Sequence, residues 1–245
     1  MAEPAERPET PIDAQKIFVL PDRERLEALA EFAAGAGHEI NNPLATIIGR
    51  AQMLLKEERD PQRRQMLMSI GAQAYRVRDM IGDAMLFGRP PQPEPRIVLL
   101  SEIVAQAITR QAELLASGRC QVVDKVPESL SLHADPTQLA IVVSELLRNA
   151  VQAMHPDGGV IEISAQAQLA QAVIEITDCG KGFTEIERQH AFDPFFSGRQ
   201  AGRGLGFGLC KCWRIVDQHG GQIEIVSAPG GPTTVRVVWP CAEKM

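Results

Sequence analysis

The sequence contains no run of about 20 apolar residues, which is the length that a helix needs to cross a bilayer. Its first twenty residues, MAEPAERPETPIDAQKIFVL, carry prolines and acidic side chains where a secretory signal would have a basic and then an apolar segment. We therefore expect a cytoplasmic protein with no membrane span.

An excess of basic charge is also missing. Lysine and arginine total 25 against 31 acidic residues, which gives a formal net charge of −6. A surface that binds nucleic acid normally needs a basic patch, whereas Arg63 and Arg64 form an isolated pair among acidic and glutamine residues. We therefore expect no nucleic-acid partner.

Cysteine is scarce and carries no motif. The five cysteines are odd in number and include no C-x-x-C spacing. This pattern supports neither a disulfide framework nor a zinc site. We expect reduced thiols, most of them packed in the interior.

The whole sequence is 44% apolar and 23% charged, which is typical of globular proteins. Two long stripes of apolar and small residues predict a pair of helices before residue 88. The first stripe comprises Leu26, Ala30, Ala33, Gly37, Ile40, Leu44, Ile47, Ala51 and Leu54, and the second comprises Leu67, Ile70, Ala74, Val77, Ile81 and Ala84. Asp60 and Pro61, between the stripes, suit a helix end and a new start. One antiparallel hairpin of this length buries too little apolar surface to be stable alone, so we expect a four-helix bundle with a second copy, in a homodimer.

The segment GRPPQPEPR, residues 88–96, marks a change of pattern. Its four prolines forbid continued helix and favour an extended, semi-stiff connector. We expect a flexible N-terminal segment at 1–20, a helical domain at 21–88, a linker at 89–96 and a second domain at 97–245.

Beyond the linker, expected helices alternate with β-rich runs. The helices are expected at 101–116, 135–154 and 209–220, and the strands at 120–126, 159–166, 172–178, 221–228 and 233–239. The later strands alternate apolar and polar residues or are nearly continuously apolar, as in a sheet with one face covered by helices. The pattern predicts an α/β sandwich.

Two glycine-rich stretches in this second part predict a nucleotide site. DCGKGF, residues 178–183, follows an expected strand, and GRQAGRGLGFGL, residues 198–209, leads into an expected helix. Glycine lets the backbone approach a ligand closely, and a helix N-terminus favours an anionic phosphate. Asp178, at a strand end, can accept a hydrogen bond from an amino group such as that of adenine.

A third motif, SELLRNAVQAM, lies on an expected helix. Glu145 and Asn149 are four residues apart and share a helix face. An amide oxygen held there can ligate a Mg²⁺ ion that bridges phosphates. A solvated polar pair accounts for this spacing equally well, so the motif gains its weight from the others.

In their order along the chain, ELLRNA, DCGKGF, FDPFFSGR and GRGLGFGL resemble the N, G1, F and G2 boxes of the family that unites sensor histidine kinases, gyrase-type ATPases, heat-shock chaperones and mismatch-repair ATPases. HEINNPL resembles the H box of a two-component sensor histidine kinase, with His38 as the phosphoacceptor. The motif style is most similar to that of the soluble, nitrogen-regulation type. The resemblance implies a Bergerat ATP-binding fold behind a dimeric helical hairpin. It also implies ATP and Mg²⁺ as ligands, transfer of the phosphoryl group to an aspartate of a response regulator, and phosphatase activity toward that regulator.

The resemblance also assigns roles at the nucleotide site. It implies Asn149 as the Mg²⁺ ligand beside Glu145, Asp178 as the adenine contact, Gly180 and Gly182 as backbone beneath the base, Phe195 and Phe196 at the hinge of the ATP lid, Arg199 or Arg203 as a γ-phosphate contact, and Gly204, Leu205, Gly206 and Gly208 as the phosphate-side loop. Cys179 stands where many relatives carry asparagine, which leaves its effect on nucleotide affinity open.

The H box has a chemistry that its residue types explain. A neutral imidazole at His38 is a competent nucleophile toward a γ-phosphoryl group. Glu39 is suited to accept a proton from the ring nitrogen that does not attack. Asn42, one helical turn further, can orient a water molecule, and the resemblance gives that position a role in dephosphorylating the partner's aspartate. Pro43 removes a backbone donor and loosens the helix there, while the small residues of AAGAG leave room for the nucleotide domain to approach.

Two other functions compete with this interpretation. One is an ATP hydrolase, or a kinase acting on another residue, because Glu145 lies where gyrase-like ATPases carry a glutamate that activates water. The other is a nucleotide-binding scaffold that docks a receiver protein without catalysis. The H box disfavours the first, and the intact set of His38, Asn149, Asp178 and the G2 glycines disfavours the second.

Neither an input domain nor a receiver domain is expected within the sequence, because the residues before Pro21 are too few for a folded domain. We therefore expect one of three sources for the stimulus: a partner protein, the N-terminus of the first helix, or a region outside this sequence. The phosphoryl group is expected to leave to a separate protein.

Overall fold

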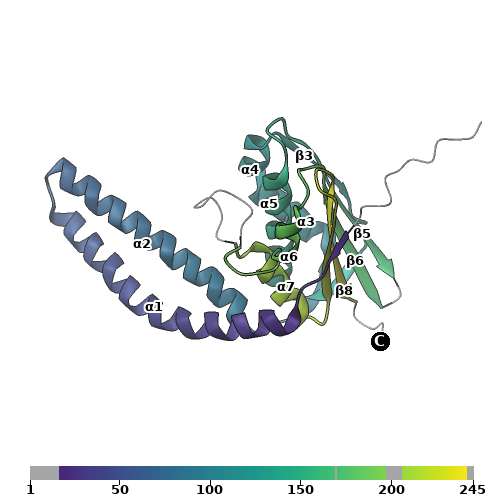
Figure 1. The fold of residues 1–245 in the computed structure, drawn as a ribbon, viewed down its shortest axis with the longest axis horizontal. Coiled ribbons are helices and arrows are strands. Elements are labelled where there is room, and N and C mark those ends of the chain that lie inside the picture. The colour runs from purple at the N-terminus through teal and green to yellow at the C-terminus, as the bar shows by residue number, and fades with distance from the viewer. Residues whose placement is uncertain (1–16, 169, 197–205, 242–245) are drawn as a thin grey trace, which may run out of the picture.

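The computed structural model describes residues 17–168, 170–196 and 206–241. Its first large feature is a hairpin of two long helices, α1 (Arg23–Glu57) and α2 (Pro61–Gly88), which extends away from the rest of the molecule (Figure 1). Asp22 caps α1 by accepting a hydrogen bond from the Arg25 amide, and Asp60 caps α2 in the same way through the Arg63 amide. The helix stop and restart expected at Asp60 is therefore where the hairpin turns.

The apolar stripes of the hairpin are only partly buried. Residues that face the partner helix or the α/β unit are buried, among them Leu26, Ala30, Ala33, Leu44, Ile48, Ala51, Ala74, Ile81 and Ala84. Other stripe residues are exposed, namely Ile40, Ile47, Leu54, Ile70 and Val77. Ile48 takes the buried position beside Ile47. Two antiparallel helices can cover only one side of such a stripe, so an apolar face remains uncovered.

The remainder of the chain is a mixed sheet covered by helices on one face. Within the described residues, six strands form one sheet in the order β1-β7-β8-β6-β5-β3. These strands are β1 (Ile17–Val19), β3 (Cys120–Lys125), β5 (Gly159–Gln168), β6 (Gln171–Asp178), β7 (Gln222–Ser227) and β8 (Thr233–Pro240). Only β3 and β5 are paired in parallel. β2 (Arg96–Leu99) and β4 (Ser131–Ala134) form a separate antiparallel pair.

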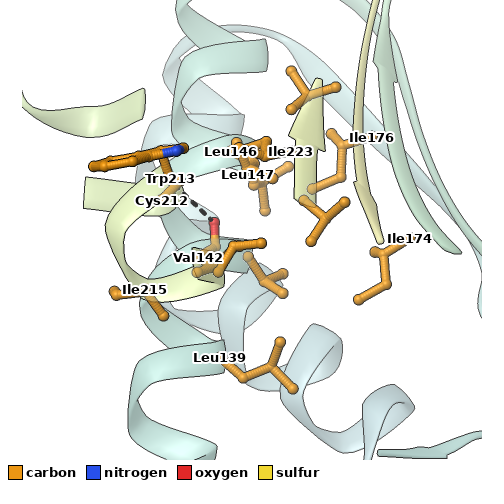
Figure 2. Close-up of a cluster of buried hydrophobic side chains, with 14 of the residues drawn as sticks. Leu139, Val142, Leu146, Leu147, Ile174, Ile176, Cys212, Trp213, Ile215 and Ile223 are labelled. Carbon is orange, nitrogen blue, oxygen red and sulfur yellow. Dashed lines mark hydrogen bonds between the residues drawn. The ribbon is translucent and has the colours of Figure 1, made fainter. Parts of the chain in front are cut away.

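The covering helices lie together on one side of the sheet (Figure 1). They are α3 (Leu100–Arg110), α4 (Ala112–Ser117), α5 (Pro136–Ala153), α6 (Glu185–Gln189) and α7 (Gly208–Gln218). Figure 2 shows the core between these helices and the sheet, where Leu146 and Leu147 of α5 lie beside Ile223 of β7 and toward Ile176 of β6. Strands β6 and β8 alternate buried and less buried positions along much of their length, as expected for a sheet with one covered face.

Four elements were not predicted from the sequence. β2, β4 and α6 are short, with at most five residues each, so they give little periodic signal. β1 lies at the end of the segment expected to be flexible over 1–20, and its residues Ile17–Val19 pair with the edge strand β7. An unpaired edge offers backbone donors and acceptors to any adjacent extended chain, which the sequence pattern alone does not reveal.

Ion pairs connect the helical hairpin to the α/β unit formed by residues 96–241. They join Arg23 to Asp217, Arg25 to Asp193, Glu27 to Arg214 and Asp83 to Lys211, at 2.7–3.0 Å. Phe87 at the end of α2 also packs against Trp213 of α7, with ring centroids 6.3 Å apart. The two parts of the chain are thus in direct contact.

No helix in the described part of the chain combines the length and apolar character needed to span a membrane. All five cysteines are described and are free thiols. Cys210 and Cys212 are buried in α7, whereas Cys179 is exposed. Cys120 and Cys241 are partly buried, so the expectation that most of the thiols are packed in the interior holds fully only for Cys210 and Cys212.

Candidate nucleotide site

A cavity of about 350 Å³ lies at the end of the sandwich where α5, β6 and the start of α7 meet. It brings together residues from four separate motifs of the sequence. Its lining includes Asp83, Arg148, Asn149, Asp178, Lys181, Gly182, Glu187, Phe196, Gly206 and Gly208. A drug-sized ligand needs a cavity of this order of size with a few convergent polar groups.

Asp178 lies in this cavity because it is the last residue of β6, at the point where the chain turns into the glycine-rich loop. The side chain is buried, and its Oδ1 accepts a hydrogen bond of 2.9 Å from the Gly180 amide. Burial raises the pKa of Asp178 to about 6, although the Gly180 hydrogen bond opposes the shift. A buried carboxylate with one oxygen already held is suited to accept a bond from a ligand amino group.

Two glycines let the backbone line the cavity in conformations that other residues avoid. Gly182 has φ +65° and Gly206 has φ +69°. A Cβ at Gly206 would lie 2.5 to 2.6 Å from the backbone of Phe195 and Phe196. Gly180 is equally confined, since a Cβ there would lie 2.8 Å from Asp178 Oδ1. The glycines therefore permit the close packing of loops that forms the cavity wall.

Asn149 lies on the cavity wall one helical turn after Glu145. A Cβ at Gly208 would come within 3.2 Å of both terminal atoms of the Asn149 amide, so the glycine leaves open space there. No described residue forms a hydrogen bond with this amide, and its oxygen can serve as a ligand. Among the described residues, no cluster of three or more His, Cys, Asp or Glu side chains could hold a metal. One amide oxygen beside a phosphate site fits Mg²⁺, which takes few protein ligands and completes its shell with phosphates and water.

Glu145 does not open directly onto the cavity, because two cations hold its carboxylate. Lys211 Nζ lies 3.0 Å from its Oε1, and Arg148 pairs with its Oε2. Lys211 is nearly inaccessible and also pairs with Asp83 of α2 at 2.7 Å. Burial alone would lower the pKa of Lys211, but the carboxylates of Glu145 and Asp83 more than offset it, so the pKa is raised and the amine stays charged.

Phe195 and Phe196 are the last described residues before 197–205. The ring of Phe195 packs on Phe207 with centroids 4.6 Å apart, and that of Phe196 lies 5.3 Å from His190. Phe196 lines the cavity, while Phe195 is largely exposed and has φ +64°. The predicted contacts Arg199, Arg203, Gly204 and Leu205 lie outside the described residues.

His38, Glu39 and Asn42 lie together on α1. The helix continues through Pro43, which lacks the backbone N–H for a helical hydrogen bond. Glu39 and Asn42 are exposed, and neither lines the cavity. Gly37 packs tightly, since a Cβ there would lie 2.5 Å from the Met85 side chain, whereas Gly35 has open space around it. Of the small residues preceding His38, Gly35 leaves room for an approaching domain and Gly37 instead allows α2 to pack closely.

Sequence reasoning missed three residues at this site. Arg148 lies within the N motif and Lys211 follows the G2 motif on α7, but a cation on a helix usually marks a solvated face. Asp83 belongs to α2, and only the folded arrangement brings it to the cavity. The sequence offered one sign that Lys211 is buried, namely its position between the apolar residues Cys210 and Cys212.

Comparisons with known proteins agree with this geometry. The family described as "Histidine kinase-, DNA gyrase B-, and HSP90-like ATPase" matches residues 134–243, and the "His Kinase A (phospho-acceptor) domain" matches residues 28–93. The two matches follow each other in the order that a kinase core requires.

Curated relatives are sensor kinases that are longer than this chain. AtoS of Escherichia coli K12, a signal transduction histidine-protein kinase, is 31% identical over 218 residues, covering 89% of this chain and 36% of AtoS. NtrB of Klebsiella oxytoca, a sensory histidine kinase/phosphatase, is 31% identical over 236 residues, covering 90% of this chain and 65% of NtrB. The chain thus spans between about a third and two thirds of these relatives.

Solved structures share the fold. Full-length ShkA in complex with AMPPNP gives a TM-score of 0.72 at 19% identity, covering 86% of this chain and 46% of ShkA. ThkA in complex with the response regulator protein TrrA gives 0.60 at 24% identity, covering 90% of this chain and 64% of ThkA. The expected architecture of a helical hairpin followed by an α/β sandwich is confirmed. The chain belongs to the histidine kinase family.

Proposed function

We propose that this chain is the catalytic core of a sensor histidine kinase, which uses ATP to phosphorylate His38 and passes the phosphoryl group to an aspartate of a separate response regulator. The observation that carries the proposal is the cavity that joins Asn149, Asp178 and Gly208 in a chain that also carries an H box on α1. ATP and Mg²⁺ are the proposed ligands, with adenine at Asp178 and the metal at Asn149. ShkA binds an ATP analogue on a similar fold, which supports this choice.

The chemistry assigns separate roles to the residues of α1. His38 would attack the γ-phosphorus with one ring nitrogen while Glu39 accepts the proton from the other. Bound Mg²⁺ would supply charge neutralisation at the phosphates. Asn42 would orient a water molecule for dephosphorylation of the regulator, and the resemblance to NtrB, described as a kinase and phosphatase, supports that second activity.

The pairing of Glu145 argues against an ATP hydrolase. A glutamate that activates water must have an oxygen free to accept a proton. Here the buried amine of Lys211 binds one carboxylate oxygen of Glu145, and Arg148 binds the other in the protein without ligand. Lys211 is only 4% exposed and stays in contact with Glu145 when Arg148 moves, so this carboxylate always has a cation beside it and is poorly placed to activate water.

Dimerisation and a receiver-domain partner complete the proposal. The exposed Ile40, Ile47 and Leu54 recur every seven residues on α1, which suits a bundle with a second copy. ThkA binds a response regulator, and we propose the same class of partner here. The cytoplasmic location, the separate sensory partner and the domain limits at 20, 88 and 96 stay predictions.

Labelling with ATP tests the proposal directly. The protein is incubated with γ-labelled ATP and Mg²⁺, and the label is then exposed to acid and to alkali, because a phosphoramidate is acid-labile and alkali-stable. His38→Gln should abolish labelling and leave ATP binding intact. His133→Gln, which alters an exposed histidine on β4, is the matched control. Stoichiometric label on the His38→Gln protein would refute the assignment.

A further inference from the structure

The cavity has an unequal distribution of charge at its wall. Its described lining contains two cations, Arg148 and Lys181, and the carboxylates Asp83, Asp178 and Glu187. Lys181 is already paired with Glu187 at 2.6 Å, on the loop that follows Asp178. A nucleotide carries several negative charges on its phosphates and is repelled by unpaired carboxylates. Arg148 is therefore the described cation that is placed to receive them.

Arg148 lies on the part of the cavity wall that also carries Asn149. It directly precedes Asn149 on α5, so both lie at the proposed metal and phosphate end. Its side chain is 38% exposed and lines the cavity, so a ligand can reach it. A guanidinium presents several donors in a fixed plane that matches the oxygens of a phosphate.

Glu145, the carboxylate that pairs with Arg148, has a second cationic partner. Glu145 is paired with Lys211 as well, and the Lys211 side chain is only 4% exposed. Lys211 therefore cannot turn toward the ligand, and it leaves Glu145 with a cationic partner if Arg148 moves, although it shares its charge with Asp83. An uncompensated buried carboxylate would make such a movement costly.

We infer that Arg148 binds the phosphate chain of the nucleotide, exchanging its bond to Glu145 for bonds to phosphate oxygens, while Lys211 holds Glu145. Arg148 is then a binding residue and Lys211 a positioning residue. The inference rests on the proposed function, because it takes the cavity to bind ATP. It deepens that proposal by naming a cation of the N motif as a recognition group for phosphate.

Calorimetry with ADP, a non-hydrolysable ATP analogue and adenosine tests the inference on the whole chain. Arg148→Gln should weaken ADP and the ATP analogue by about 10-fold or more, since a charge-assisted bond is lost. Adenosine, measured by competition, should bind within about twofold of wild type. Arg236→Gln is the matched control, because Arg236 is likewise held by carboxylates, Glu175 and Glu224, but its position alternates with the buried residues of β8 and so lies on the face of the sheet away from the helices.

A double variant separates binding from a structural role. If Arg148 only neutralised Glu145, then Glu145→Gln together with Arg148→Gln would restore ADP affinity. A phosphate contact predicts that the double variant stays about 10-fold weaker than Glu145→Gln alone. Restored affinity, or undiminished ADP binding by Arg148→Gln, would overturn the inference. A wild-type protein that binds neither nucleotide would instead overturn the proposed function.

Discussion

Asp178 is a buried carboxylate whose environment opposes its charge. Its pKa of about 6 lies above the ordinary value of 3.8, so the folded protein binds this proton more tightly than the unfolded chain does. The resulting stability is complete below about pH 4 and is lost as the pH rises through about 6. At neutral pH the group therefore costs the unliganded fold up to about 3 kcal/mol. A carboxylate retained at that cost favours a role in binding.

The variant Asp178→Asn should show this cost. The amide can still accept the Gly180 hydrogen bond but carries no charge. We expect the variant to be about 1–3 kcal/mol more stable than wild type at pH 8 and nearly equal to it at pH 4, with ATP binding lost. Urea unfolding at both pH values and calorimetry with ATP make the measurement. A stability difference that does not change with pH would contradict the assignment of the pKa.

Asn42 and Glu39 share the exposed surface of α1 near His38, and they should separate two activities. Truncating the Asn42 amide removes a group that can orient water but cannot accept its proton. Asn42→Ala should keep labelling of His38 within a few fold and slow dephosphorylation of the phosphorylated regulator by roughly 10²-fold, which is about 2.7 kcal/mol. Glu39→Ala should lose kinase activity first. Phosphate release from a purified phospho-regulator is the assay, and equal rates for wild type and Asn42→Ala would rule out this role.

At the scale of elements, the hairpin leaves an apolar face that its own two helices do not cover. Ile47 on α1 is 47% exposed and lies between Ile40 and Leu54 in a repeat of seven residues. Ile47→Glu should leave the protomer folded and weaken dimerisation by roughly 10²-fold or more, since both copies lose a buried isoleucine. Sedimentation of the whole chain measures it. Ile97→Glu, at an exposed position on β2, should have no effect, and a monomeric wild-type protein would show that the face has another use.

The elements that could be predicted from the sequence are those long enough to repeat their apolar pattern several times. The stripes of α1 and α2 and the alternation of β5, β6, β7 and β8 repeat often enough to identify each element. β1 and β4 are too short for that, and they depend on pairing with distant strands. The site divides in the same way, since Asn149 and Asp178 lie in local motifs. Asp83 reaches the cavity only because α2 packs on α7, a contact that no local pattern encodes.

At the scale of the whole molecule, the hairpin and the α/β unit must move relative to each other if one enzyme phosphorylates its own histidine and then serves a regulator. The contacts between them suit such movement. Arg23 and Arg25 are exposed, and exposed ion pairs contribute about 0–1 kcal/mol each. Only the pair of Lys211 with Asp83 is substantially buried. Asp83 of this pair also lines the cavity, so α2 borders the candidate nucleotide site.

Asp83→Asn should therefore loosen the contact between the two parts. Lys211 keeps Glu145 as a partner, so the loss is smaller than for an isolated buried charge, and we expect a destabilisation of about 1–2 kcal/mol. Hydrogen exchange should become faster at the end of α2 and at the start of α7, while the core strands β6 and β8 stay protected. Asp79→Asn is the matched control one turn earlier, since Asp79 is 64% exposed and pairs only with its exposed neighbour Arg78. If both variants exchange alike, the Lys211 pair does not hold α2 against the α/β unit, and the position of the hairpin depends on the remaining contacts, which are the packing of Phe87 against Trp213 and the ion pairs of α1.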